Sequence, residues 1–113
     1  MSERIELVAE DIRRYIFDLI VPIQTTKVIN ENAFISAIIA AREMAVLLKG
    51  LEMLPRKVLY DLDMAAGILE NESEYSSSPE KLKEMAQDFR LTLGLILCGE
   101  IHADRQPGVP RVR

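Results

Sequence analysis

Apolar side chains recur at helical spacing along most of the chain. Between Ser2 and Ile20 they stand three and four residues apart, and charged side chains fill the positions between them. This is the pattern of an amphipathic helix. We expect the helix to end at Val21, because the residue before Pro22 is pushed out of the α region. Its apolar positions are Ile5, Val8, Ile12, Tyr15 and Leu19.

A second helix is predicted from a cap at Asn30 or Asn32 to about Lys49. Large apolar residues surround nearly its whole circumference and alanines fill most of the remainder, which is typical of a buried helix. A bundle of four short helices does not enclose one helix on every side, so we expect part of this surface to contact a second copy of the chain. The residues predicted to form that interface are Ile35, Ile38, Ile39 and Val46, with Leu91 and Leu95 from a second apolar strip near the end of the chain.

Two further helices follow. Gly50 is a natural stop, and Pro55 suits the first turn of a third helix that runs to about Glu70. The acidic, serine-rich segment up to Ser78 is predicted to be a solvated loop. Ser78, followed by proline and glutamate, starts a fourth helix, which Gly99 bends or ends.

Leucines alternate along residues 91–97 and also fit a strand, but no partner strand is found elsewhere in the sequence. The predicted fold class is therefore all-α: a bundle of about four helices, orthogonal or up-down, and a homodimer. Residues 1–104 are expected to form one domain, and residues 105–113 an extended basic tail that contains proline and glycine.

The composition is that of an ordinary soluble domain, with 49% hydrophobic and 28% charged residues in a chain of 113. The longest apolar run, Leu93 to Cys98, is far shorter than a membrane span, and no signal peptide opens the chain. A single cysteine agrees with a reducing compartment. These features favour a cytoplasmic protein without membrane contact.

No catalytic, cofactor or metal motif is found. Cys98 and His102, four residues apart, could form a nucleophile pair. Cys98 stands in an apolar stretch, however, and is expected to be buried and inert, and His102 is expected to meet the dipole at a helix C-terminus. We therefore expect no enzyme activity, no cofactor and no metal.

Acidic residues are concentrated between Asp61 and Glu80 with no base among them, and Glu80, Glu84 and Asp88 form a stripe on the fourth helix. We interpret both as solvated surface, with Asp61 and Asp63 facing away from the core. An acidic segment of this kind could also dock a basic partner.

The charge is asymmetric. The net charge of −4 divides into +3 on residues 105–113 and −7 on residues 1–104. Arg105, Arg111 and Arg113 could bind a partner.

The sequence favours a small non-enzymatic interaction module, an adaptor, regulator or inhibitor of another macromolecule, that acts as a homo-oligomer. A nucleic-acid-associated regulator that uses the tail arginines is the alternative, and the acidic body disfavours it because it repels phosphates.

Overall fold

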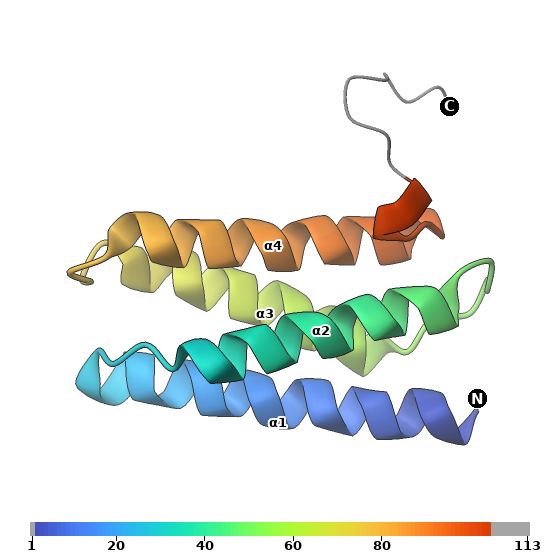
Figure 1. Ribbon diagram of the computed structural model, residues 1–113, viewed down its shortest axis with the longest axis horizontal. Coiled ribbons are helices and arrows are strands. Elements are labelled where there is room, and N and C mark those ends of the chain that lie inside the picture. Colours follow the sequence, from blue (N-terminus) through green and yellow to red (C-terminus); the bar gives the residue numbers. More distant parts are fainter. Residues whose placement is uncertain (1, 105–113) are drawn as a thin grey trace.

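The computed structural model describes residues 2–104, and over that range the regular elements are all helices (Figure 1). The all-α prediction is thus confirmed. The predicted tail with Arg105, Arg111 and Arg113 lies outside the described residues. The elements are α1 (Glu3–Thr26), α2 (Glu31–Leu48), α3 (Arg56–Ser73), α4 (Pro79–Cys98) and a 3₁₀ turn, η1 (His102–Asp104).

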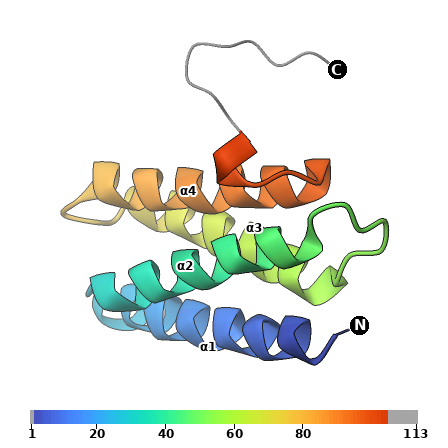
Figure 2. The same cartoon turned by 45° about the vertical axis from the view of Figure 1, so that its right-hand side comes forward.

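The four helices form two antiparallel hairpins, α1–α2 and α3–α4, that pack against each other (Figures 1 and 2). Helix α1 packs against α2 and α3, and α4 packs against α3 and α2, so the order around the bundle is α1, α2, α4, α3. Because the hairpins lie side by side, α1 and α3 are parallel neighbours, and so are α2 and α4. The segment 49–55 crosses from one hairpin to the other.

Helix α1 is longer than the sequence predicts. It continues through Pro22 to Thr26 and ends where Lys27 adopts a left-handed conformation (φ 61°). The expected stop at Val21 is therefore wrong. A proline inside a helix costs about 3 kcal/mol. Burial of one isoleucine gains about 1.5–3 kcal/mol, and the continued helix buries Ile23 in the core. The gain from tertiary packing is thus of the same size as the local cost and offsets it.

Helix α2 is buried on one side and exposed on the other. Its five buried alanines face the core together with Ile38, Met44 and Leu48, while Ile35, Ile39 and Val46 face solvent. One chain thus leaves part of the helix surface uncovered, as expected, and its contact with a second copy stays a prediction. Small inward side chains let α2 approach its neighbours closely, and the isoleucines on the opposite side then have no partner in the bundle. The residues buried on α2 are Ala33, Ala37, Ile38, Ala40, Ala41, Met44, Ala45 and Leu48.

The helix ends follow the sequence signals more closely. The Asn30 side chain caps α2 by accepting a hydrogen bond from the Ala33 amide at 3.1 Å, which decides between the two asparagines. Gly50 and Gly99 both have positive φ. Ser78 occupies the N-cap position of α4, although its side chain makes no capping bond. Helix α3 extends to Ser73, which shortens the predicted loop.

Candidate functional site

Several large apolar side chains are exposed on residues 2–104, and two groups of them follow helices. The first is the outward face of α2, here called the α2 stripe, which consists of Ile35, Ile39, Arg42 and Val46. The exposed fractions of its three apolar residues are 51%, 60% and 57%, respectively. The four residues of the stripe are spaced four, three and four positions apart, which places them in one row along the helix.

Two of the residues predicted to share this interface lie elsewhere. Ile38 and Leu95 are buried within the one chain, and the expectation that they face a second copy is corrected. Ile38 lies on the inward side of α2. Leu95 is buried where the chain turns back after Gly99, and its carbonyl accepts a hydrogen bond from the Glu100 amide at 2.8 Å.

Leu91 keeps its predicted position at the surface and lies at the edge of the α2 stripe. Ile35 lines a shallow hollow between α2 and α4 together with Asp88. Leu91 stands one turn after Asp88 on α4 and is exposed. The α2 stripe and Leu91 therefore belong to the same side of the molecule.

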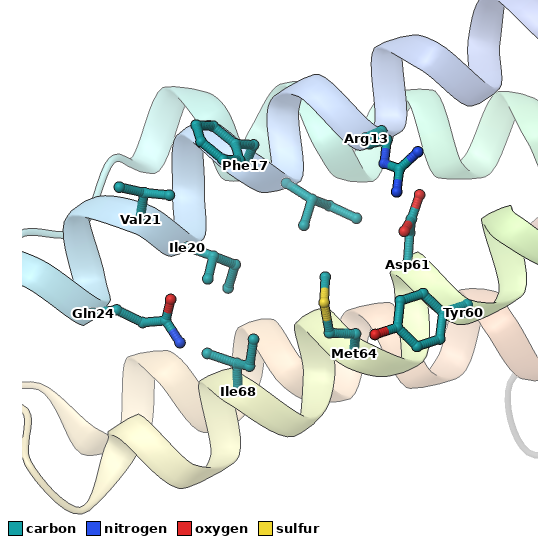
Figure 3. A pocket seen from close by; sticks show the side chains of 10 residues that line it. Arg13, Phe17, Ile20, Val21, Gln24, Tyr60, Asp61, Met64 and Ile68 are labelled. Carbon is teal, nitrogen blue, oxygen red and sulfur yellow. The ribbon is translucent and has the colours of Figure 1, made fainter.

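The second surface is a groove between the parallel helices α1 and α3 (Figure 3). It has a volume of about 370 Å³. Phe17 and Tyr60 stand on its two sides and are exposed to 65% and 62%. We call this the α1–α3 groove. It is lined by Arg13, Ile16, Phe17, Ile20, Val21, Gln24, Tyr60, Asp61, Met64 and Ile68.

Asp61 is the unusual residue in this groove. It is only 4% exposed, which contradicts the expectation that it faces away from the core. Its carboxylate faces Arg13 across the groove (Figure 3), yet no hydrogen bond or ion pair within 4 Å holds it to any residue in the range 2–104. Burial raises the pKa of Asp61, and the charges of Arg13 and Lys57 oppose that shift. Because Asp61 lines this open groove, solvent reaches its carboxylate there.

The other acids of α3 are neutralised within the chain. Arg90 of α4 donates to both carboxylate oxygens of Glu70, at 2.6 and 2.9 Å, and pairs with Asp63 at 3.2 Å. The Arg90 hydrogen bonds hold the pKa of Glu70 below its ordinary value. Lys27 pairs with Glu72 at 3.2 Å. These pairs connect helices, so the acidic segment serves packing as well as solvation.

Cys98 and His102 do not share a helix face, because α4 ends at Cys98 and Gly99 reverses the chain. Cys98 is exposed, so the expectation of a buried thiol is wrong. His102 lies in η1, beyond the end of α4, with its Nε2 atom 3.3 Å from the hydroxyl of the buried Thr92. The predicted contact of His102 with the terminal turn of a helix is thus replaced by a link between η1 and α4.

Within residues 2–104, no group of three or more histidine, cysteine, aspartate or glutamate side chains is placed to hold a metal ion. None of the helices in this range is both long and apolar enough to cross a membrane. Comparison with family models, curated proteins and solved structures gives no match.

Proposed function

We propose that this protein is a small non-enzymatic interaction module that works as a homodimer, with the α2 stripe as the self-association surface. The observation that carries the proposal is the row formed by Ile35, Ile39 and Val46, each more than half exposed on one face of a rigid helix. A contiguous apolar row of this kind is typical of a protein contact.

The charges at the two ends of α2 favour a second copy as the occupant. Glu31 precedes the α2 stripe and Lys49 follows it, and both are exposed. If two α2 helices pair antiparallel, Ile35 of one copy lies opposite Val46 of the other, and Glu31 lies opposite Lys49. The end charges and the outer apolar residues are therefore matched under a two-fold axis. Arg42 of each copy then lies opposite Ile39 of the other, close to the axis.

Each of these two charges is also held in place within the chain. Glu31 pairs with Lys81, and Lys49 pairs with Asp104 at 2.9 Å. The Lys49 hydrogen bond holds the pKa of Asp104 below its ordinary value. Both pairs lie at the solvent boundary, where an ion pair contributes little energy but fixes the position of a charge.

Sedimentation equilibrium at micromolar concentration tests the proposal. We expect the wild-type chain to show about twice its mass of 12.8 kDa and Ile39→Asp to be a folded monomer, because an unpaired charge in a dimer contact is not compensated. Since Ile39 is exposed in one chain, its substitution is expected to leave the thermal midpoint of the monomer nearly unchanged.

Leu97→Asp is the matched control. Leu97 is exposed to 59%, almost the same as Ile39, but stands about 240° around α4 from Leu91. Its variant is expected to remain dimeric. A monomeric wild-type protein, or equal dissociation by both variants, would contradict the assignment of the contact to the α2 stripe.

A further inference from the structure

The shallow hollow between α2 and α4, here called the α2–α4 hollow, has an excess of acid. Its charged lining residues are Glu31, Lys81, Glu84 and Asp88. Lys81 is already paired with Glu31. Neither Glu84 nor Asp88 forms an ion pair within 4 Å with any described residue. The hollow thus presents two carboxylates without a close counterion, beside the exposed side chain of Ile35.

The matching chemistry in this chain is the segment 105–113. It contains Arg105, Arg111 and Arg113 and no acid, and two valines stand among its basic and turn-forming residues. The segment is therefore opposite in charge to the α2–α4 hollow and has apolar side chains to offer to Ile35.

The point at which the chain enters this segment is fixed by two contacts. Asp104 pairs with Lys49, just beyond α2, at 2.9 Å. The Nε2 atom of His102 lies 3.3 Å from the hydroxyl of Thr92 on α4. The chain therefore leaves η1 on the α4 side of α2, at the opposite end of α2 from the α2–α4 hollow.

Within one chain this distance is long. Lys49 and Ile35 are about 21 Å apart along the helix direction at 1.5 Å per residue. Nine residues span at most about 30 Å, so only the last few residues of the segment can reach the hollow of their own chain.

The proposed antiparallel dimer removes this distance. Its two-fold axis is perpendicular to the paired α2 helices, so it reverses their direction and keeps α4 of both copies on the same side of the pair. Lys49 of one copy then lies opposite Glu31 of the other, and Asp104 is brought beside the second copy's hollow. All of the segment 105–113 is then within reach of Glu84 and Asp88.

We propose that the segment 105–113 of each copy docks in the α2–α4 hollow of the other copy, with Arg111 and Arg113 on the carboxylates of Glu84 and Asp88. The inference rests on the proposed function, because it requires the antiparallel dimer. Opposite charges across a contact fix its register and exclude other partners. The segment thus gives the apolar α2 contact a charged, self-specific second part.

Charge reversal on each side of the contact provides the test. The segment variant is the full chain with Arg111→Glu and Arg113→Glu, and the hollow variant is the full chain with Glu84→Lys and Asp88→Lys. Each should raise the dissociation constant of the dimer by about tenfold or more, because like charges then meet. Sedimentation equilibrium at low salt measures this change, and high salt should reduce it.

A mixture of the two variants distinguishes exchange between copies from docking within one chain. In the mixed dimer each segment meets the opposite charge on the other copy, so it should form about tenfold more tightly than either variant alone. If the segment docks on its own chain, both variants remain repulsive in the mixture. A mixture that dimerises no better than its components would therefore overturn the inference.

Glu6→Lys with Glu10→Lys is the matched control. These are also two acids four residues apart without an ion pair to a described residue, but they are exposed on α1. This variant changes the net charge as much as the hollow variant and should keep the wild-type dissociation constant. An equal loss of dimer in both would show an effect of net charge alone and would contradict the assignment. Thermal melts verify that each variant is folded.

The wild-type protein separates this inference from the proposed function. A wild-type monomer would defeat the dimer and the inference together. A wild-type dimer whose dissociation constant neither reversal changes would leave the dimer intact and overturn the inference alone.

Discussion

The α2 stripe and the α1–α3 groove both expose apolar side chains, but for different physical reasons. On α2 the inward residues are mostly alanines, so the helix lies close to its neighbours and Ile35, Ile39 and Val46 are left on a convex face. On α1 and α3 the inward residues are large, as at Ile12 and Leu62, and the apolar side chains that remain line a concave depression. The size of the inward residues thus determines whether the remaining exposed apolar side chains form a convex face or line a groove.

The two surfaces also differ in how their charges are arranged. The α2 stripe lies between an acid and a base at its opposite ends, which is the arrangement that an antiparallel copy of itself can match. At one end of the α1–α3 groove two bases, Arg13 and Lys57, stand among two acids, Glu10 and Asp61. The charges at the ends of the α2 stripe are thus far apart along one helix, whereas those of the groove are intermixed.

The largest effect is expected when a small inward residue of α2 is replaced by a large one. Ala41 is fully buried, so Ala41→Leu should overpack the contact and destabilise the fold by about 1–3 kcal/mol. That corresponds to a lower thermal midpoint by roughly 4–8 °C per kcal/mol for a domain of this size.

Ile39→Ala, on the opposite side of the same helix, is the control for this experiment. Measured by circular dichroism melts at a concentration where the protein is monomeric, it should cost much less, since Ile39 is exposed. Equal losses for the two variants would show that the outward side of α2 is packed as tightly as the inward side.

Much of the fold could be predicted from the sequence, because it depends on local rules. Helical spacing located all four helices, and caps and glycines located several of their ends. The prediction failed where distant contacts decide the outcome. Pro22 lies inside α1, which continues to bury Ile23, and Leu95 is buried although it stands off the main apolar face of α4. Neither burial is indicated by the neighbouring residues in the sequence.

The candidate surfaces were predicted less well. Four of the six interface residues are exposed as expected, but the α1–α3 groove was missed because Asp61 was assigned to the solvent side. A signal was present: Asp61 stands three residues after Val58 and four before Ala65, both buried, so helical spacing places it on the inward side. The charged residue type was given more weight than its position.

A smaller effect is expected at Asp61. Asp61 is only 4% exposed, and burial raises the pKa of its carboxyl above the ordinary value of 3.8. Asp61→Asn removes the buried charge and should stabilise the fold by up to about 1 kcal/mol at neutral pH. Because the folded state binds this proton more tightly than the unfolded state, the wild-type protein loses stability as the pH rises through the raised pKa. The gain from Asp61→Asn should therefore vanish at pH values below 3.8.

Thermal melts of both proteins across this pH range measure the gain. A less stable Asp61→Asn protein at neutral pH would show that attraction from Arg13 and Lys57 exceeds the cost of burial.

The smallest effect is expected at Glu70, the second acid of α3 with a shifted pKa. Glu70 has the opposite environment to Asp61, because it is exposed and accepts two hydrogen bonds from Arg90. Glu70→Gln should destabilise the fold by about 0.2–1 kcal/mol at neutral pH, and less in high salt. The pKa of Glu70 is lowered from 4.5, so the contribution of its carboxylate to stability is present above that value and is lost as the pH falls through the lowered pKa.

Thermal melts at neutral and acid pH should show the midpoints of Asp61→Asn and Glu70→Gln approaching that of the wild type from opposite sides as the pH falls. Parallel trends in the two variants would mean that Asp61, like Glu70, gains more from its basic neighbours than it loses by burial.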